Sequence, residues 1–258
     1  MIRRSVFEGS FYPSNKDKLQ KLIKDYLEKV DRVEDSESIK ALIVPHAGYI
    51  YSGEIAAYGY KLLEKDIERI LILGLSHRVL VKGIALADFD TWSTPLGEVK
   101  VADLNKKLTL EDNFTVVNTA HAQEHSIEVQ MPFLQTCLET DFEIIPMVTG
   151  QSIQYKNVAT ILNKYLNRKD VFIVSSDLSH YLPYSRAKKN DKETVKKILK
   201  LEKIEEDDRA CGKDGINILI ELAKLNNWKP KLLDYRNSGD TAGDKSKVVG
   251  YASIAFYS

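Results

Sequence analysis

The stretch Ala41-Leu42-Ile43-Val44-Pro45-His46 carries the pattern that decides the fold: a short apolar run, a tight turn and then a histidine. Two further stretches repeat this pattern. They are Ile70-Leu71-Ile72-Leu73-Gly74-Leu75-Ser76-His77 and Val171-Phe172-Ile173-Val174-Ser175-Ser176-Asp177-Leu178-Ser179-His180. Continuous apolar runs of this length are typical of strands that are buried on both faces, as in parallel sheets covered by helices. The sequence therefore predicts three buried strands that each end near a histidine.

Helical and strand patterns alternate along the rest of the chain. Helices are predicted over Asn15 to Lys29 with Ser14 as the N-cap, after a second N-cap at Ser52, and over Ser126 to Leu138 with an interruption near Pro132. The turn-forming residues from Asp90 to Gly97 predict a loop. No linker, repeat or low-complexity tract divides the sequence. We therefore expect residues 1–258 to form a single-domain α/β layered fold, with a central mixed sheet flanked by helices.

Composition excludes several classes of function. Lys and Arg number 37, as do Asp and Glu, so the formal net charge is zero and there is no overall attraction to nucleic acid or acidic membranes. No apolar run approaches the roughly 20 residues of a membrane span, and the first residues lack the apolar segment of a signal peptide. We expect a cytoplasmic protein with no nucleic-acid partner and no membrane partner.

The two cysteines, Cys137 and Cys211, are too few for a disulfide framework. Cys137 is predicted to lie in the core on the apolar side of its helix. Cys211 has no neighbouring base or partner cysteine in the sequence that would mark it as reactive. Neither cysteine is predicted to belong to a site.

The three strand-end histidines predict a site. Ligands of open α/β sheets bind at the carboxyl ends of the strands, so His46, His77 and His180 are expected to converge on one cleft. Imidazole is the commonest metal ligand and a frequent acid or base near neutral pH. Asp177 precedes His180 by three residues, and a carboxylate at that distance can orient the imidazole and raise its basicity. These residue types in this pattern indicate a metal-binding or acid–base site.

A second histidine motif is open to two interpretations. The string His121-Ala122-Gln123-Glu124-His125 matches the H-x-x-E-H motif of inverted zinc peptidases. That motif requires both histidines on one continuous helix, whereas Ser126 is a better N-cap than an interior residue. In the preferred interpretation this segment, with His125 and Glu128, lines the same cleft as the strand-end histidines or braces those histidines by hydrogen bonds. A zinc hydrolase is the less favoured interpretation.

Other residues are expected around this cleft. Tyr49 and Tyr51 follow His46 closely enough to reach it. Near the C-terminus, Asp240 or Asp244 could complete a metal site of two histidines and one carboxylate, the set used by non-haem Fe(II) oxygenases. Paired Gly-Asp steps are usually turn formers, so a turn is the favoured role for each aspartate taken singly.

The motifs together resemble those of the Memo family, named after a mediator of ErbB-driven cell motility. They are Gly9-Ser10-Phe11-Tyr12-Pro13, Pro45-His46-Ala47-Gly48-Tyr49-Ile50-Tyr51-Ser52-Gly53, Ser76-His77, Glu124-His125-Ser126-Ile127-Glu128, Ser176-Asp177-Leu178-Ser179-His180 and Val249-Gly250-Tyr251-Ala252. The resemblance runs from the N-terminus to the last predicted strand and keeps the motifs in order. It implies a fold similar to that of the class III extradiol dioxygenases, which bind non-haem iron through two histidines and a glutamate.

The resemblance also implies roles for individual residues. By position, His46 and His77 match the two metal-binding histidines of those dioxygenases, and His180 matches their acid–base histidine. Family members related to the animal protein carry a cysteine near Thr241, where the dioxygenases place the glutamate. This chain has Thr241 there, with Asp240 beside it. The resemblance thus implies an iron or copper ion and leaves the third ligand open.

The sequence leads to one expected function and one alternative. We expect a cleft that binds an iron or copper ion and supports redox or oxygenase-type chemistry on a small molecule. The alternative is a non-catalytic module that binds a peptide or a small anion in the same cleft, lined by Tyr49, Tyr51 and Arg78. Animal Memo proteins are discussed both as signalling adaptors and as metal-binding redox proteins, so whether the chain is an enzyme stays open. The sequence does not specify an oligomeric state.

Overall fold

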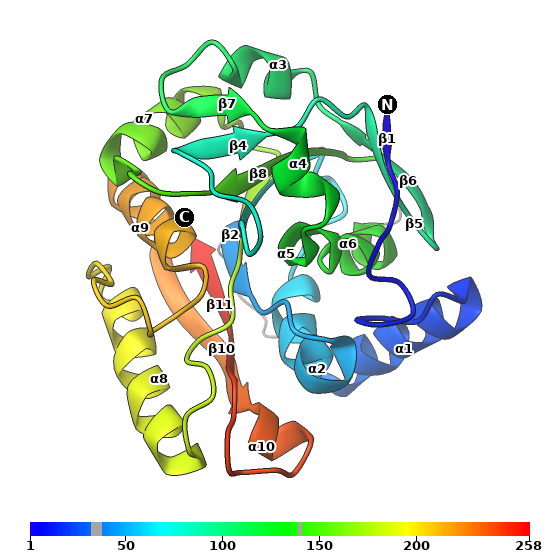
Figure 1. The fold of residues 1–258 in the computed structure, drawn as a ribbon, viewed down its shortest axis with the longest axis vertical. Helices are drawn as coiled ribbons and strands as arrows, with labels where there is room; N and C mark the ends of the chain where they lie inside the picture. The colour runs from blue at the N-terminus through cyan, green and yellow to red at the C-terminus, as the bar shows by residue number, and fades with distance from the viewer. Residues whose placement is uncertain (32–37, 139–140) are drawn as a thin grey trace.

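The computed structural model describes residues 1–31, 38–138 and 141–258 and has a central mixed sheet with helices on both faces (Figure 1). Within these residues the sheet has 11 strands, in the order β1-β5-β6-β8-β3-β9-β2-β11-β10, and β4 joins it by pairing with β8 and with β7. The predicted α/β fold is therefore confirmed.

The strands are β1 (Ile2–Arg3), β2 (Ile39–Val44), β3 (Arg69–Leu75), β4 (Ile84–Leu86), β5 (Thr91–Thr94), β6 (Gly97–Val101), β7 (Phe114–Val116), β8 (Glu143–Thr149), β9 (Asp170–Ser175), β10 (Lys229–Asn237) and β11 (Gly250–Tyr257). The helices are α1 (Lys16–Lys29), α2 (Tyr49–Tyr60), α3 (Leu104–Leu108), α4 (Asn118–Ala122), α5 (His125–Glu128), α6 (Met131–Leu138), α7 (Tyr155–Tyr165), α8 (Tyr184–Leu199), α9 (Lys213–Asn226) and α10 (Ser238–Thr241).

The three strands that precede the histidines are neighbours in the sheet. Strand β9 lies between β3 and β2 and is parallel to both, with Phe172 opposite Leu71 on one side and Ala41 on the other. Parallel neighbours end at the same edge of a sheet, so the turns after these strands lie together. This arrangement explains how histidines more than 100 residues apart in the chain reach one place.

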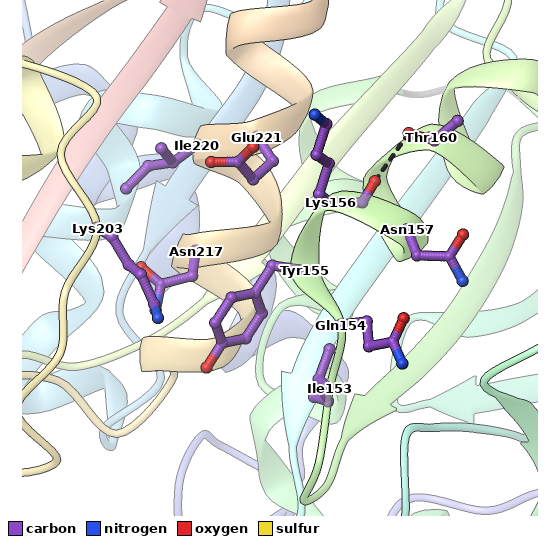
Figure 2. A pocket seen from close by; sticks show the side chains of 10 residues that line it. All are labelled: Ile153, Gln154, Tyr155, Lys156, Asn157, Thr160, Lys203, Asn217, Ile220 and Glu221. Carbon is purple, nitrogen blue, oxygen red and sulfur yellow. Dashed lines mark hydrogen bonds between the residues drawn. The ribbon is translucent and has the colours of Figure 1, made fainter.

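Successive residues of the central strands enter two different cores. Leu42 and Val44 pack on one side of β2, while Ala41 and Ile43 pack on the other. Helices α1, α2 and α6 contribute to the first core, and α7, α8 and α9 contribute to the second. Helices α7 and α9 pack against each other and border an open cavity (Figure 2). Burial on both faces explains why these strands are apolar throughout.

Three local predictions are wrong in detail. Asn15, not Ser14, caps α1, because its side chain accepts a hydrogen bond from the Lys18 amide. Ser52 is not an N-cap but lies inside α2, where its hydroxyl donates a hydrogen bond to the Ala47 carbonyl. The predicted loop from Asp90 to Gly97 instead contains β5 and its turn to β6, because alternate residues such as Trp92 point into the core.

The predicted helix over Ser126 to Leu138 is divided as expected near Pro132. It forms α5 and α6, and Pro132 occupies the first turn of α6, where its missing amide hydrogen removes no helical hydrogen bond. Among the described residues, no helix is long and apolar enough to cross a membrane.

Candidate metal centre

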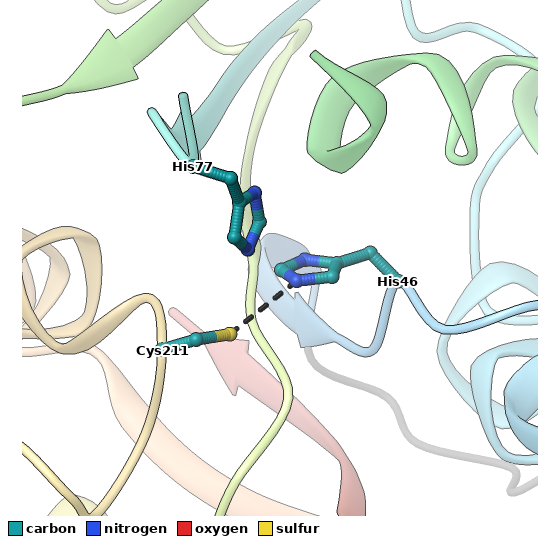
Figure 3. A group of neighbouring side chains, drawn as sticks. All are labelled: His46, His77 and Cys211. Atoms are coloured by element: carbon teal, nitrogen blue, oxygen red, sulfur yellow. Dashed lines mark hydrogen bonds between the residues drawn. The ribbon is translucent and has the colours of Figure 1, made fainter. Parts of the chain in front are cut away.

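The structure brings His46, His77 and Cys211 together at the carboxyl edge of the sheet (Figure 3). The two imidazole rings are perpendicular, and their centroids are 5.5 Å apart. The Sγ atom of Cys211 lies 3.3 Å from Nε2 of His46. One donor atom from each residue lies within 4.8 Å of the others. The expected convergence of His46 and His77 is therefore observed, with a third donor that the sequence did not predict.

Cys211 reaches the cluster from the segment that precedes α9. Its backbone amide donates to the Asp177 carbonyl at 3.3 Å, and the Asp177 amide approaches the sulfur at 3.2 Å. Gly212 follows, and a Cβ atom there would lie 2.6 Å from Cβ of Ser176, so only glycine allows this close approach. The sequence interpretation missed Cys211 because its partner base lies 165 positions away. The only local signal was a Cys-Gly pair directly before a helix.

The hydrogen bonds around His46 fix which ring nitrogen carries its proton. The Ser175 hydroxyl donates to the Ser126 carbonyl and accepts from Nε2 of Gln130 at 2.7 Å. Ser175 therefore has only acceptor capacity left for Nδ1 of His46 at 2.9 Å, so Nδ1 donates and Nε2 keeps its lone pair. Burial, followed by the charge of His77, lowers the pKa of His46 to about 3. A neutral His46 thus presents Nε2 to Cys211.

His77 is oriented by the buried carboxylate of Glu124. Nδ1 of His77 and the His77 backbone amide each donate to Glu124 at 2.8 Å. The same carboxylate caps α5 by accepting from the amides of His125 and Ser126 at 2.8 and 2.9 Å. Burial alone would raise the pKa of Glu124, but the hydrogen bonds and charge of His77 lower it to about 2. The ionised carboxylate holds the proton on Nδ1, so Nε2 of His77 is also free to bind a metal.

His125 lies beside these rings, as predicted for a cleft residue. It stacks on His77 with centroids 4.3 Å apart, and its other face packs against Phe11 at 4.8 Å. Burial lowers the pKa of His125 to about 4. His77, Glu124 and His125 also have donor atoms within 4.8 Å of one another. Because the Glu124 oxygens already accept four N–H groups, we interpret this second group as a hydrogen-bonded support for His77.

His180 and Asp177 do not form the expected pair. Nδ1 of His180 lies 2.8 Å from the Leu178 carbonyl, which can only accept, so His180 donates there. Asp177 instead accepts the His46 backbone amide at 2.8 Å, which fixes the turn after β2. Burial raises the pKa of Asp177. His180 belongs to neither ligand group.

Asp240 and Thr241 lie elsewhere. The Asp240 carboxylate accepts the Asn237 amide at 3.0 Å in a capping box at α10, and it accepts the Tyr184 hydroxyl at 2.7 Å. Asp240 therefore serves as a helix cap, in line with the turn alternative, and it belongs to neither ligand group. The hydroxyl of Thr241 is buried and has no hydrogen-bond partner within the described part of the chain.

Two other predicted cleft residues have structural contacts. Glu128 is fully buried and binds the N-terminal segment through Arg3, the Phe7 amide and the Tyr12 hydroxyl. Tyr49 is buried in α2, and its hydroxyl donates a hydrogen bond to the Val129 carbonyl. Both residues face the core because they follow the apolar side of their helices.

Tyr51 and Arg78 are the predicted cleft residues that stay accessible. Tyr51 is 39% exposed, and Arg78, which follows His77, is exposed as well. Within the cluster itself, His77 is exposed, Cys211 is half-buried and His46 is buried.

The H-x-x-E-H string is divided between two helices. His121 lies in the last turn of α4, where its Nε2 donates to the Ala85 carbonyl at 3.0 Å in the core. His125 is the first residue of α5. The two histidines do not share a helix face, so the geometry of an inverted zinc peptidase is absent from the described residues.

Comparison with known proteins identifies similar chains. A family model described as "Memo-like protein" matches residues 3–255. The chain is 37% identical to a "MEMO1 family protein" of Sulfurisphaera tokodaii, and the alignment covers 99% of each chain. It is also 37% identical to a "MEMO1 family protein" of Aquifex aeolicus, again over 99% of each. A "MEMO1 family protein" of Nitrosopumilus maritimus is 34% identical, over 99% of this chain and 100% of that protein.

Proposed function

The chain belongs to the Memo-like protein family, and we propose that His46, His77 and Cys211 bind a redox-active transition-metal ion. The observation that carries this proposal is that one ring nitrogen from each imidazole and the sulfur of Cys211 lie within 4.8 Å of one another. Both imidazoles are held by hydrogen bonds at Nδ1, which is the usual arrangement of metal-binding histidines in proteins.

The donor set favours copper over iron. A thiolate is a soft ligand that suits Cu(I) and zinc, and imidazole suits copper, zinc and iron alike. The carboxylate expected from Asp240 would have favoured Fe(II), but that side chain caps α10. The Cys211 thiolate supplies the single negative charge that offsets part of the charge of the ion. We therefore propose Cu(I) as the preferred ion, with Fe(II) binding more weakly.

The surrounding residues support proton-coupled chemistry at this centre. A bound copper or iron ion would supply one-electron redox chemistry. We propose that His180, whose Nδ1 is held by the Leu178 carbonyl, moves protons for a small-molecule substrate. Asp177 positions the His46 backbone, and Glu124 positions the His77 ring. The competing function is binding of a peptide or small anion without turnover in the same cleft.

Metal titration of untagged protein tests the proposal. The full-length chain should bind one Cu(I) ion under anaerobic conditions, and His46→Ala, His77→Ala and Cys211→Ser should each weaken binding at least tenfold. Cys137→Ser is the matched control for Cys211→Ser, because Cys137 is also partly buried but belongs to neither ligand group. Equal Cu(I) affinity in the wild type and the three ligand variants would contradict the proposal and favour the binding module.

A further inference from the structure

A second hollow lies away from the histidine cluster, between α7, α9 and the segment that precedes α9 (Figure 2). Its volume is about 730 Å³, and none of its lining residues belongs to either ligand group. Small-molecule sites in proteins commonly have volumes of about 300–1,000 Å³. The hollow therefore has the size of a binding site and is lined by none of the proposed metal ligands.

One wall of this cavity is apolar. Ile153 and Tyr155 line it and are both partly exposed, whereas Ile220 lies almost fully buried behind them. The Tyr155 ring and Ile153 lie on the same side of the cavity (Figure 2). The Tyr155 hydroxyl donates to Asp214 in the first turn of α9 at 2.5 Å, which fixes the orientation of the ring. A ligand ring can pack on the Tyr155 ring in an offset or edge-to-face arrangement.

The polar side of the cavity is positively charged. Lys203 lies with its Nζ atom 5.3 Å from the Tyr155 ring centroid, and Lys156 lines the cavity from α7. Neither lysine forms an ion pair with a described carboxylate. The acidic lining residue Glu221 is already paired with Lys224 at 2.9 Å. An anionic group would therefore find two cations without carboxylate partners at the edge of the apolar wall.

The segment that carries Lys203 is held in place. Asn217 of α9 is buried, and its side-chain amide makes two hydrogen bonds with the backbone of Ile204. Its oxygen accepts from the Ile204 amide at 2.9 Å, and its nitrogen donates to the Ile204 carbonyl at 2.8 Å. Ile204 itself is fully buried. Lys203 is thus attached to a fixed backbone, and a ligand would not have to order this segment on binding.

We propose that this cavity binds a small organic anion that carries a flat ring. The ring packs against Tyr155 and Ile153, and the carboxylate or phosphate lies at the rim of the cavity, where Lys203 and Lys156 supply the positive charge. A carboxylate and a phosphate would each supply the negative charge of such an aromatic anion, and the probes below distinguish these two groups. This site goes beyond the proposed metal function and does not depend on it.

The test uses two matched pairs of probes on the full-length protein. Benzoate is compared with benzamide, and AMP with adenosine, by NMR titration up to about 5 mM, a range that detects weak sites. At least one of the two anions, benzoate or AMP, should shift the amide signals of Tyr155 and Lys203. It should bind at least about fivefold more tightly than its uncharged counterpart, because its contacts with lysine are charge-assisted. Binding by benzoate alone would identify a carboxylate site, and by AMP alone a phosphate site.

Variants supply the control. Lys203→Gln should weaken anion binding at least about fivefold, because it removes one of two charged contacts. Lys192→Gln removes the same charge from an exposed position on α8 and should leave binding unchanged. His46→Ala should also leave it unchanged, which separates this proposal from the metal centre. No binding of either anion, equal binding of the uncharged probes, or equal loss in Lys203→Gln and Lys192→Gln would overturn the proposal.

Discussion

Two buried glutamates four positions apart should respond in opposite ways to the same substitution. Glu124 and Glu128 are both almost fully buried, and each accepts hydrogen bonds from several donors. Glu124 faces the proposed metal ligand His77, whereas Glu128 faces the N-terminal segment. Replacement of each by glutamine keeps the size of the side chain and removes its charge. The comparison therefore separates support of the metal centre from support of the fold.

The expected magnitudes follow from the contacts. In Glu124→Gln, the carboxylate that holds the His77 proton becomes a neutral amide, and loss of such a partner typically weakens metal binding 10- to 100-fold, or about 1.4–2.7 kcal/mol. In Glu128→Gln, the buried guanidinium of Arg3 loses its charge partner, and breaking a buried ion pair costs about 3–5 kcal/mol of unfolding free energy. Glu128→Gln should leave metal affinity unchanged, because its partners are not metal ligands.

Competitive titration of Cu(I) against a chelator measures the affinity, and urea denaturation of the metal-free proteins measures stability. The expected profile is weaker metal binding with a smaller stability loss for Glu124→Gln, and a large stability loss with wild-type affinity for Glu128→Gln. Wild-type Cu(I) affinity in Glu124→Gln would refute the role assigned to the Glu124–His77 hydrogen bond.

Three further outcomes are expected. Burial raises the pKa of the Cys211 thiol, so metal binding must displace a proton from it. Metal affinity, titrated at about pH 7.5 and 8.5, should therefore rise about tenfold per pH unit in the wild type but not in Cys211→Ser. Burial lowers the pKa of His46 to about 3 and that of His121 to about 4, below the value near 6.5 of an unfolded histidine. The unfolding free energy of the metal-free protein should therefore fall as the pH drops through 6.5, by roughly 2 kcal/mol per histidine at pH 5. Urea titrations should show a smaller fall for His121→Gln. Asp240→Ala should lower stability by about 1 kcal/mol through loss of the capping box and leave metal affinity unchanged, and a loss of metal in this variant would restore Asp240 as a ligand.

The fold and two of the three cluster residues, His46 and His77, follow from local sequence patterns. The apolar runs before His46, His77 and His180 predicted buried strands, and parallel strands necessarily end at one edge. The sequence could not show that β9 lies between β2 and β3, but any adjacent order of these strands brings the histidines close. Local pattern was sufficient here because the site is built on the sheet itself.

The remaining ligand depends on long-range packing. Cys211 is placed by the start of α9, and its contacts with Ser176 and Asp177 span more than 30 positions. Asp240 was the candidate ligand in the sequence, yet the Asn237 amide and the Tyr184 hydroxyl satisfy its oxygens. A single sequence contains no local feature that separates these two outcomes, because each depends on which segment packs beside the sheet edge.

X-ray absorption at the copper edge tests the central proposal most directly. Untagged full-length protein loaded with one equivalent of Cu(I) should show one sulfur and two imidazole nitrogens around the metal, and the sulfur should disappear in Cys211→Ser while it persists in Cys137→Ser. A copper environment of nitrogen and oxygen alone in the wild-type protein, or one that Cys211→Ser leaves unchanged, would contradict the assignment of His46, His77 and Cys211 as the metal site.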